Sequence, residues 1–446
     1  MRTQLLSNEL PTQLLSKINS IVNKYLRFID NVYLVEGFSR GCVYDLQNGN
    51  LYSIGQKTVT AIQKALASQK GISGVSKSDQ KRLQPLRDLG LLVESDSETP
   101  VVAISELQKK YPVAFSWIEV TRKCNLKCTF CYEESSPDCY EKMTFDDFQV
   151  AITNLKDIGV KSIQFIGGEP MILGSELKKM ILFARSDFDF IEVYTNGVFI
   201  NKDWAHFFKE HEINVALSIH SYIPEEHDRV TTVKHSHKKV ENAARLLTEA
   251  GCVFRVGAVA TKSCTVGTRP KESLYSIRPD SIRLTGRATF SEYTFEMFAQ
   301  KAITKETKSL PLSKSQVSQF VSGHQCFLKD LYIGAKLDVF PCVMERRFQY
   351  GNLKTDQLKD IIDNKIRYLS KDNIEGCQDC EYRYTCFDCR PDSNGRGKLQ
   401  KPWFCAYDPY QGEWIEVKTM FDQLQSGTFV YPQKPVKSDS KKTVPS

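Results

Sequence analysis

The sequence contains no run of 18 apolar residues, and its N-terminus, "MRTQLLSNELPTQLL", has no apolar core. Neither a transmembrane helix nor a secretory signal peptide is therefore expected. Short DNA- and RNA-binding motifs are missing too, and the net charge of +7, from 60 basic and 53 acidic residues, is mild and spread along the chain. A solvated mixed surface explains this balance better than nucleic-acid binding does. We expect a cytoplasmic protein without a membrane or nucleic-acid partner.

Cysteine, in contrast, is plentiful, with 14 residues in a chain of 446. Because cytosolic thiols stay reduced, this number indicates metal binding rather than disulfides. Most of the cysteines gather in two places. The first group is Cys124, Cys128 and Cys131 in "TRKCNLKCTFCYEE", and the second group spans residues 326–405.

The first 97 residues are expected to form a separate module. Residues 1 to about 27 predict a polar amphipathic helix, and "NVYLVEG", "GCVYDLQ" and "NLYSI" then alternate as short strands do. "QKTVTAIQKALAS" and "SKSDQKRLQPLRDLGLLVE" carry apolar residues at helical spacing. Three strands followed by helices predict a winged-helix-like domain. A polar linker, taken as residues 98–112, separates it from the rest.

Between residues 113 and 310 the pattern becomes strand, loop and helix, repeated. Amphipathic stretches such as "FDDFQVAITNLKDIG" and "HKKVENAARLLTEAG" separate six apolar runs rich in strand formers. Alternating units of this kind predict an α/β fold with a parallel sheet, and six units are too few for a full eight-stranded barrel. We therefore predict a partial (β/α)6 barrel with its site at the C-terminal strand ends. The six predicted strands are "SWIEVT", "SIQFIGG", "FIEVYTNG", "NVALSIH", "CVFRVGAVA" and "SIRLTG".

Residues 318–415, called here the cysteine-rich region, are expected to be loop-like and to bind metal. Their cysteines are spaced C-x15-C, then C-x2-C-x5-C-x2-C, then a last Cys. Seven thiols are too many for one metal ion, and zinc remains an alternative because C-x2-C pairs also form zinc knuckles. Residues 427–446 are rich in Pro, Ser and Lys and predict a disordered tail. The seven cysteines are Cys326, Cys342, Cys377, Cys380, Cys386, Cys389 and Cys405.

The first cysteine loop directly follows the first predicted barrel strand. A [4Fe–4S] cluster has four irons, and each takes one external ligand, usually a Cys thiolate. Cys124, Cys128 and Cys131 would hold three irons and leave the fourth open for a substrate or cofactor.

This loop resembles that of the radical S-adenosylmethionine (SAM) superfamily, C-x3-C-x-φ-C, with Phe130 as the aromatic residue. The resemblance implies that Cys124, Cys128 and Cys131 are catalytic cluster ligands, and that SAM chelates the open iron. In that family, an electron from the reduced cluster cleaves SAM to a 5′-deoxyadenosyl radical, which abstracts hydrogen from an unactivated carbon. A donor such as flavodoxin or ferredoxin is implied as the electron source.

Further motifs follow the later strands in the family's order. Each alone is compatible with an ordinary barrel loop, whereas together they support the resemblance. "GGEP" is similar to the segment that binds the SAM amino group, "LSIHS" to the ribose contact and "HDRVT" to the carboxylate contact. His220 departs from the family pattern, which often has Asp at the position of the ribose contact. The implied SAM-binding residues are Phe130, Gly167, Gly168, Glu169, Pro170, Asn196, Ser218 and Arg229.

The cysteine-rich region resembles the SPASM extension of maturases for subtilosin-like peptides, pyrroloquinoline quinone precursor and anaerobic sulfatases. That extension holds two auxiliary [4Fe–4S] clusters, so three clusters are implied in all. Leu337 stands where the family usually has Gly, and the last C-x2-C replaces C-x3-C. The implied ligands are Cys326, Cys342 and Cys389 for the first auxiliary cluster, and Cys377, Cys380, Cys386 and Cys405 for the second.

Three ligands for the first auxiliary cluster leave one iron open to a substrate thiolate or water, unless a side chain other than Cys supplies a fourth. Four cysteines lie outside both groups. Cys42 and Cys252 stand in apolar strands and are expected in the core, whereas Cys139 and Cys264 stand in loops that could reach the site.

The N-terminal module resembles the precursor-recognition element of enzymes that modify ribosomally made peptides, and "YLVEGFSRGCVYDLQNGNLYSI" is similar to the start of grasp-with-spasm maturases. A leader peptide would then add a strand to an exposed sheet edge. The alternative is a structural cap on the barrel.

Three functions remain open on the sequence. The favoured one is a radical SAM peptide maturase that forms a thioether or carbon–carbon cross-link. A second is sulfatase-maturase-like formation of formylglycine, although the Asp general base that follows the second SPASM cysteine in those relatives is Val343 here. A third is a non-catalytic protein with zinc or iron in a binding scaffold.

Overall fold

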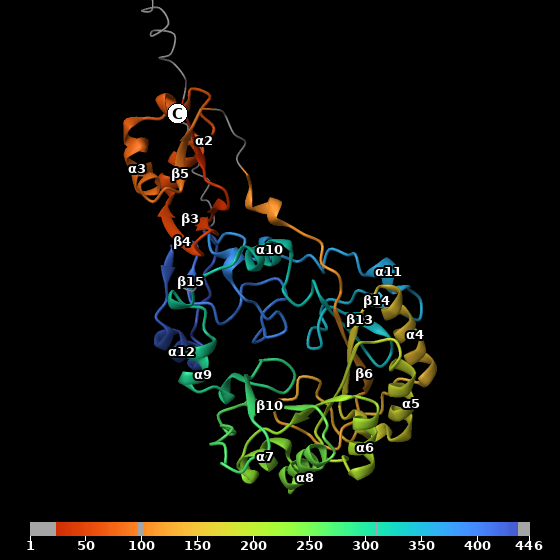
Figure 1. The fold of residues 1–446 in the computed structure, drawn as a ribbon. Helices are drawn as coiled ribbons and strands as arrows, with labels where there is room; N and C mark the ends of the chain where they lie inside the picture. Colours follow the sequence, from red (N-terminus) through yellow and green to blue (C-terminus); the bar gives the residue numbers. More distant parts are fainter. Residues whose placement is uncertain (1–23, 97–101, 309–310, 436–446) are drawn as a thin grey trace, which may run out of the picture. The chain divides into compact units, whose positions relative to one another are not determined.

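The computed structural model describes residues 24–96, 102–308 and 311–435, and Figure 1 gives their secondary structure. In the described residues no helix has both the length and the apolar character that crossing a membrane requires. The chain divides into two compact units. The first comprises Met1–Glu106, Ser309–Lys314 and Cys380–Tyr382, and the second comprises Leu107–Lys308, Ser315–Asp379 and Arg383–Ser446.

The first unit is built on a three-stranded antiparallel sheet of order β2-β3-β4, followed by two helices and a second, two-stranded sheet of β1 and β5. Its hydrophobic core includes Ile62 of the first helix, Leu83 of the second helix and Leu92 of β5, all of which are buried. Ser76 begins the second helix because its hydroxyl accepts the Asp79 N–H at 3.1 Å. The elements are β1 (Tyr25–Phe28), β2 (Val32–Glu36), β3 (Arg40–Asp45), β4 (Asn50–Gly55), α2 (Gln56–Leu66), η1 (Gly71–Gly74), α3 (Lys77–Asp88) and β5 (Leu92–Ser95).

The three predicted strands and the first predicted helix of this module are present, but two expectations differ. Residues 25–28, expected to end a helix, form strand β1, because they pair antiparallel with β5 from Tyr25 opposite Ser95. The second predicted helix ends at Asp88, and its predicted last residues from Leu92 onward belong to β5 instead. The rest of the predicted N-terminal helix, residues 1–23, lies outside the described residues.

The second unit contains a nine-stranded sheet of order β11-β10-β9-β8-β7-β6-β12-β13-β14. Strands β6 to β11 are mutually parallel, β12 adds parallel to β6, and β13 and β14 continue antiparallel. This is the predicted α/β arrangement of six parallel strands. The strands are β6 (Phe115–Thr121), β7 (Ser162–Gly167), β8 (Phe190–Thr195), β9 (Asn214–Ser218), β10 (Phe254–Ala260), β11 (Ile277–Ser281), β12 (Asp330–Ile333), β13 (Asp338–Phe340) and β14 (Gly351–Asn352).

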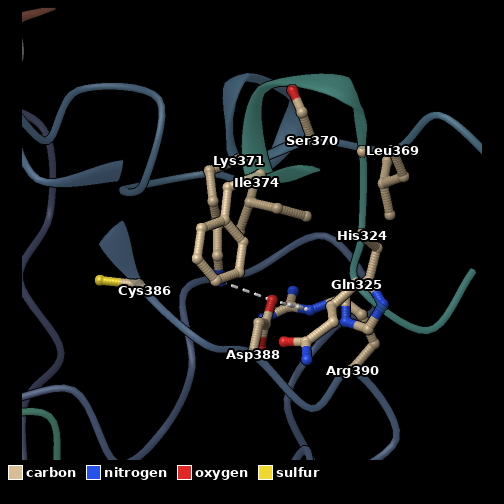
Figure 2. A pocket seen from close by; sticks show the side chains of 11 residues that line it. His324, Gln325, Leu369, Ser370, Lys371, Ile374, Cys386, Asp388 and Arg390 are labelled. Atoms are coloured by element: carbon tan, nitrogen blue, oxygen red, sulfur yellow. Dashed lines mark hydrogen bonds and ion pairs between the residues drawn. The ribbon is translucent and has the colours of Figure 1, made fainter. Parts of the chain in front are cut away.

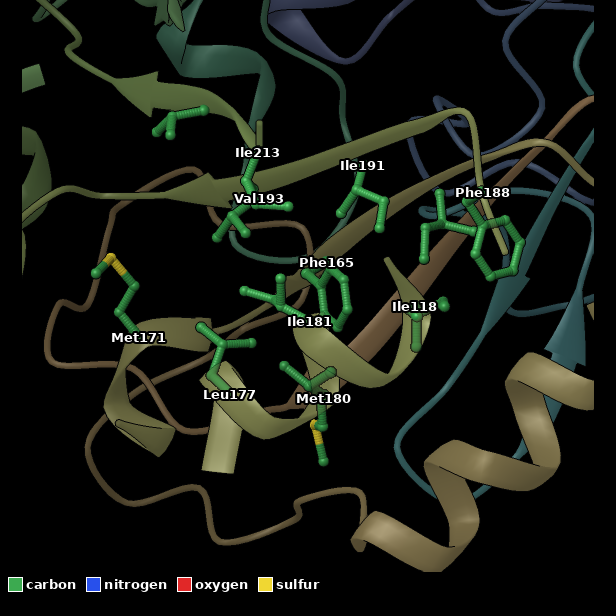
Figure 3. Close-up of a cluster of buried hydrophobic side chains, with 14 of the residues drawn as sticks. Ile118, Phe165, Met171, Leu177, Met180, Ile181, Phe188, Ile191, Val193 and Ile213 are labelled. Carbon is green, nitrogen blue, oxygen red and sulfur yellow. The ribbon is translucent and has the colours of Figure 1, made fainter. Parts of the chain in front are cut away.

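Helices between the strands cover the outer face of this sheet (Figure 1). Figure 3 shows Leu177, Met180 and Ile181 of α5 facing Phe165 and Val193 of the neighbouring strands, and all are essentially fully buried. Such close packing of apolar side chains fixes where each strand ends. The helices are η3 (Pro170–Leu173), α4 (Phe145–Asp157), α5 (Ser175–Ala184), α6 (Lys202–Glu210), α7 (Pro224–Thr231) and α8 (Ser236–Glu249).

The sixth barrel strand is displaced from its prediction. "SIRLTG", residues 281–286, was expected, whereas β11 is Ile277–Ser281. β11 contains Pro279, which cannot donate to a ladder, but the strand tolerates it as the edge strand, paired only with β10. The residues that follow instead turn toward the first cysteine loop, and Gly286 has a φ of +58° there.

The rest of the second unit has little regular structure. Its core is a second apolar cluster around Trp403, Phe298 and Phe421. Phe429 and Tyr431, in the predicted disordered tail, pack against this cluster, while residues 436–446 lie outside the described residues. The remaining elements are η2 (Ile104–Leu107), η4 (Phe290–Glu292), α9 (Phe295–Lys301), η5 (Glu306–Lys308), α10 (Lys314–Ser322), α11 (Leu358–Ile361), η6 (Lys371–Asn373), η7 (Arg383–Thr385), β15 (Tyr407–Asp408), β16 (Glu413–Trp414) and α12 (Val417–Ser426).

Candidate functional site at the C-terminal strand ends

The first cysteine loop is fixed by backbone hydrogen bonds on both sides. Cys124 N–H donates to the Ser136 carbonyl at 3.1 Å, and Thr129 N–H donates to the Val230 carbonyl at 2.9 Å, near the end of α7. Cys131 N–H donates to the Cys128 carbonyl at 3.3 Å, which curls the loop. These hydrogen bonds therefore fix the backbone of the cysteine loop directly after the end of β6.

All three thiol-bearing residues line one cavity of about 590 Å³, called here the cysteine cavity. The rest of its wall comes mainly from the C-terminal ends of the barrel strands, as predicted from the fold. Phe130, Gly167, Gly168, Asn196 and Ser218 line the cavity, together with Trp117, Gln164, Tyr194, His220, Arg255, Arg278, Asp280, Arg283, Val343 and Met344 among others.

The three thiols are close enough to influence one another electrostatically. Burial, with a smaller contribution from the nearby Glu169 and Cys131 charges, raises the pKa of Cys124 to about 12. Burial, with Cys124 and Cys131 as neighbours, also raises the pKa of Cys128. Buried thiols become thiolates only when a cation compensates them, so this donor set fits a cationic iron–sulfur group. Among the described residues no cluster of His, Cys, Asp and Glu is spaced for a single metal ion.

Gly167 and Gly168 lie directly against the start of the cysteine loop. A Cβ on Gly167, whose φ is +151°, would stand 2.1 Å from the Thr121 carbonyl oxygen. A Cβ on Gly168 would stand 2.3 Å from the Lys123 carbonyl oxygen, while its N–H donates to Thr121 at 2.7 Å. Only glycine permits this close approach, and it leaves both residues on the cavity wall.

Glu169 is fully buried and is not among the residues that line the cysteine cavity. Its carboxylate accepts the Met171 N–H at 3.0 Å, the Thr195 hydroxyl at 2.6 Å and the Asn196 N–H at 2.7 Å. Burial raises the pKa of Glu169 to about 7, against the effect of these donors. The side chain thus joins the end of β7 to the end of β8.

Asn196, which Glu169 holds by its backbone, faces the cysteine loop. Its amide nitrogen Nδ2 lies 3.9 Å from the Cys124 sulfur and donates to the Asn125 side chain at 2.9 Å. An amide near a thiol favours the thiolate, because it donates to the charged form. This contact links the "YTNG" turn to Cys124.

Three histidines form a stack behind Phe130, which sequence reasoning did not find. The His220 ring lies edge-on to Phe130 with centroids 4.8 Å apart, His227 stacks on His220 at 5.4 Å, and His237 meets His227 at 5.4 Å. Burial lowers the pKa of His220 to about 4 and that of His227 to about 3. His220 Nδ1 accepts the Val259 N–H at 3.3 Å, so the neutral ring carries its proton on Nε2.

Several predicted residues do not line the cavity. Arg229 donates to the Ser263 carbonyl at 3.2 Å, and Pro170 is buried at the start of η3. The thiol of Cys264 is buried against the His220 carbonyl, and Cys139 lies 3.8 Å from the Ser136 hydroxyl. Neither loop cysteine is therefore part of the cavity wall.

Arg287 holds the cysteine loop by hydrogen bonds, and it was not identified from the sequence. Its side chain donates to the Cys128 carbonyl at 2.9 Å and to the Ser135 carbonyl at 2.7 Å, while its backbone N–H donates to the Cys131 carbonyl at 3.1 Å. A Cβ on the preceding Gly286 would stand 2.4 Å from the same Cys131 oxygen. The segment mistaken for a strand therefore supports the loop, and a Gly-Arg pair was its one sequence signal.

The seven cysteines of residues 326–405 are called here the second thiol set. Three of them are close enough to affect one another's pKa. Burial raises the pKa of Cys326, with Cys342 and Cys389 as charged neighbours, and raises that of Cys342 to about 12. Arg283 hydrogen-bonds to Cys389 and also lines the cysteine cavity, as do Val343 and Met344 next to Cys342. These thiols therefore adjoin the cavity.

Among the other four of the seven cysteines, the structure shows an electrostatic interaction between Cys377 and Cys405. Burial raises the pKa of Cys377 to about 11, and Cys405 is one of its charged neighbours. Cys386 and Cys405 both pack against the second apolar cluster. Cys380 belongs to the first unit, so its part in a ligand set stays a prediction.

A buried group of charges lies beside Cys386 (Figure 2). Asp388 pairs with Lys371 at 2.6 Å and with Arg390 at 2.5 Å, and all three side chains are at least 93% buried. These cations lower the pKa of Asp388. His324 lies against them, and neither ring nitrogen has a hydrogen-bond partner among the described residues.

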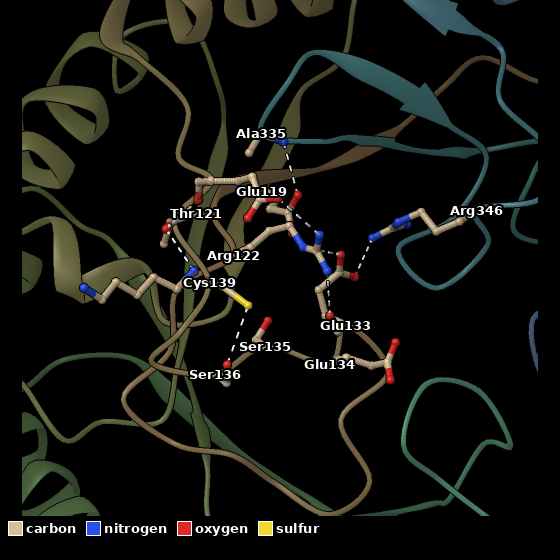
Figure 4. Close-up of polar contacts among 12 residues, drawn as sticks. Glu119, Thr121, Arg122, Glu133, Glu134, Ser135, Ser136, Cys139, Ala335 and Arg346 are labelled. Carbon is tan, nitrogen blue, oxygen red and sulfur yellow. Dashed lines mark hydrogen bonds and ion pairs between the residues drawn. The ribbon is translucent and has the colours of Figure 1, made fainter.

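The two cysteine-bearing loops are tied together by a salt bridge (Figure 4). Glu133, just after Cys131, pairs with Arg346 at 2.8 Å, and Arg346 also donates to the Cys342 carbonyl at 3.2 Å. The Arg346 guanidinium stacks 3.7 Å from the Tyr332 ring centre. The geometry of one loop is thus coupled to that of the other.

Leu337 adopts a φ of +69°, the backbone region that glycine favours. Its N–H donates to the Gly334 carbonyl at 2.8 Å in the turn between β12 and β13, and its side chain is almost fully buried. The unusual backbone therefore occurs at the position where the resembled family has Gly, and the Leu side chain fills the core there.

Comparison with known proteins finds a family match over part of the chain. Residues 118–263 match the Radical SAM superfamily. The antilisterial bacteriocin subtilosin biosynthesis protein AlbA of Bacillus subtilis is 27% identical over 45% of this chain and 46% of its own length. A probable GTP 3′,8-cyclase of Archaeoglobus fulgidus is 29% identical over 34% of this chain and 45% of its own length. The match thus spans about half the length of either relative.

Among solved structures, Streptococcus suis SuiB bound to S-adenosylmethionine aligns at 14% identity and a TM-score of 0.47, over 84% of this chain and 98% of SuiB. SuiB has also been solved bound to precursor peptide SuiA, where the alignment has a TM-score of 0.47 and 14% identity over 82% of this chain and 96% of SuiB.

Proposed function

We propose that this chain, whose residues 118–263 match the Radical SAM superfamily, modifies a ribosomally made precursor peptide by installing a thioether or carbon–carbon cross-link. The observation that supports this most is the cysteine cavity itself. Cys124, Cys128 and Cys131 line it, and so do Val343 and Met344, which directly follow Cys342 of the second thiol set. A bound [4Fe–4S] cluster and SAM supply a radical that takes hydrogen from an unactivated carbon.

In this proposal the chain's own residues bind, orient and shield. The three thiolates hold the cluster, and the amide of Asn196 supports Cys124. Gly167 and Gly168 let SAM approach the backbone, while Phe130 and Ser218 offer an apolar ring and a hydroxyl on the same wall. Enclosure of these groups keeps bulk water from a reactive intermediate.

The second thiol set is proposed to hold two auxiliary clusters. Cys326, Cys342 and Cys389 would bind the first, leaving one iron open to a substrate thiolate, to water or to a non-cysteine side chain. The remaining set would bind the second. That set is Cys377, Cys380, Cys386 and Cys405.

The N-terminal module, residues 1–97, is proposed to recognise the leader part of the precursor. Strands β2 and β4 form the two edges of its three-stranded sheet in the described residues. An extended peptide can add to such an edge by backbone hydrogen bonds, which leaves the peptide's own sequence free to vary. A winged-helix-like arrangement with this role is part of the proposal, as is an electron donor such as flavodoxin or ferredoxin.

Formylglycine formation is the second candidate. It needs a group that accepts a proton, and Val343, which lines the cavity where those relatives are expected to carry Asp, has none. The products distinguish the two reactions. A cross-link removes two hydrogens from the peptide and keeps its sulfur. Oxidation of Cys to formylglycine removes two hydrogens and replaces the sulfur by a carbonyl oxygen from water. Oxidation of Ser to formylglycine also removes two hydrogens, but it leaves a free aldehyde that a hydrazide reagent labels and a cross-link does not.

The test is anaerobic reconstitution with iron and sulfide, followed by metal analysis and reaction with SAM and dithionite. Three clusters predict about twelve irons per chain. A precursor peptide, to be sought among any short reading frames beside the gene, should change mass as 5′-deoxyadenosine appears. Tightly bound zinc with no SAM cleavage would leave only a non-catalytic scaffold. Cleavage without any change in the peptide would remove the substrate proposal but keep the radical chemistry.

A further inference from the structure

A second cavity, of about 510 Å³, lies at the opposite end of the barrel strands. Its wall contains the first residues of four strands: Phe115 of β6, Phe190 of β8, Asn214 of β9 and Phe254 of β10. We call it the strand-start cavity. Since the cysteine cavity is built from the other ends of these strands, the barrel interior is hollowed at both ends.

The two cavities adjoin inside the barrel. Trp117, Gln164 and Arg255 line both of them, from β6, β7 and β10 respectively. A sealed barrel would place a layer of apolar side chains here. In this barrel the layer between the cavities instead includes the polar side chains of Gln164 and Arg255 beside Trp117, and it is thin enough for one residue to line both cavities.

That layer is organised around Glu192 of β8, whose side chain is only 6% exposed. Arg255 donates to it through two nitrogens, at 2.8 Å and 2.7 Å, and the Gln164 amide donates to it as well. Arg255 itself is 54% exposed, because it faces the cavities. A planar guanidinium held on one edge still presents its other N–H groups to an incoming carbonyl or carboxylate.

The rim of the strand-start cavity is unusually apolar for solvent-facing surface. Val253 is 71% exposed and Phe190 is 37% exposed. Phe115 and Trp117 meet edge to face with centroids 4.9 Å apart. Aromatic and aliphatic side chains around a small number of fixed polar groups are what a peptide side chain and its backbone require.

We propose that the strand-start cavity binds the precursor peptide, with an apolar side chain against Phe190 and Val253 and a peptide carbonyl or carboxylate at Arg255, so that the peptide approaches the cysteine cavity from the strand-start end. This deepens the proposed function and rests on it. We assign the peptide to this cavity because Arg255 lines both cavities, so a molecule bound in the strand-start cavity lies next to the cysteine cavity.

The first test places a larger side chain at the rim of the strand-start cavity. Val253→Trp should raise the precursor KM about tenfold, because an indole fills the rim and displaces the contacts of about one apolar side chain. Val253→Ala should change it by less than about threefold. The matched control is Val150→Trp, at a 37% exposed position on the outer face of α4, which should leave KM unchanged. SAM cleavage by dithionite without peptide should stay at the wild-type rate in all three variants, which also reports correct folding.

The second test detects occupancy without turnover. The photoreactive residue p-benzoylphenylalanine in place of Phe190 should cross-link the precursor, and the same residue in place of Val150 should not. Unchanged KM in Val253→Trp together with no cross-link at position 190 would overturn the inference, provided that the wild-type protein modifies the peptide. If the wild-type protein leaves the peptide unchanged, the proposed function fails instead.

A third outcome also overturns it. If Val253→Trp slows SAM cleavage with reduced flavodoxin but not with dithionite, the strand-start cavity docks the electron donor and not the peptide.

Discussion

The two cysteine groups are positioned by very different kinds of structure. Cys124, Cys128 and Cys131 follow a central strand of a nine-stranded sheet, above a large apolar cluster. The cysteines after Cys342 stand on loops, among strands of two or three residues. The first group is therefore positioned by a regular sheet with an apolar core, whereas the second stands among buried charges, and we expect its loops to depend on the ligands that they are proposed to bind.

Removing the first group should have the largest effect. Cys124→Ala with Cys128→Ala and Cys131→Ala should abolish 5′-deoxyadenosine formation, since no thiolate remains to hold the cluster that SAM meets. Leader-peptide binding should persist within about twofold, because it is proposed to lie in residues 1–97. Cys252→Ala, which removes a thiol hydrogen-bonded to the Ala205 carbonyl, is the control and should keep full SAM cleavage. Reductive SAM cleavage by the triple variant would refute the assignment of this loop.

Chelation tests whether metal organises the second group. Removing iron anaerobically should speed amide hydrogen exchange across residues 326–405 by about a hundredfold or more, because metal binding there contributes folding free energy. Exchange in strands β6 to β9 should change by less than about threefold. Equal protection of both regions in the apoprotein would mean that the loops fold without their ligands.

The buried charges offer a test that leaves the cysteines untouched. Asp388→Asn should lower the free energy of unfolding by about 3–5 kcal/mol, because Lys371 and Arg390 lose the carboxylate that neutralises them. Asp422→Asn removes an exposed pair with Lys418, 53% exposed on each side, and should cost less than about 0.5 kcal/mol. Urea unfolding of both variants measures the contrast, and equal costs would contradict it.

The histidine stack gives the barrel its own pH dependence. Burial lowers the pKa of His227 to about 3 and of His220 to about 4, while an unfolded His titrates near 6.5. The unfolded state therefore binds more protons between about pH 4 and 6.5, and the free energy of unfolding falls as pH drops through that window. His227→Asn keeps an acceptor for the His220 N–H but does not titrate, so the loss between pH 7 and 5 should shrink by about 1–2 kcal/mol. His206→Asn, at an 82% exposed side chain, is the control for the substitution itself and should change the free energy of unfolding at pH 7 by less than about 0.5 kcal/mol.

A substitution at Leu337, in the turn before Cys342, tests whether backbone strain or side-chain burial contributes more to stability there. Leu337→Gly relieves a positive φ worth about 1–2 kcal/mol but removes a buried side chain worth about 2–5 kcal/mol, so a net loss of about 1–3 kcal/mol is expected on urea unfolding. Asn394→Gly, at a φ of +46°, should stay within about 0.5 kcal/mol, because Asn tolerates this region. A more stable Leu337→Gly protein would show that backbone strain outweighs burial here.

Much of the barrel was predictable because its apolar residues repeat with the local period of strands and helices. Five of six parallel strands and both quoted helices, now α4 and α8, were found by that period. The sixth failed because the triplet SIR occurs twice, at residues 276–278 and 281–283, and Pro279 argues against a strand at the first copy, which only the pairing with β10 selects. The strand at Tyr25–Phe28 failed for the same reason, since its partner β5 lies far along the chain.

By itself, the sequence determined the cysteine spacing, the order of strands and helices, and glycines at the points where the backbone approaches closely, because these depend on near neighbours in the chain. Only the tertiary structure decided that Glu169 faces inward to join two strands, that Arg287 clamps the first cysteine loop, and that Arg255 reaches two cavities. Those contacts join residues far apart in sequence, and a side chain's partner depends on which strands meet, which no local pattern records.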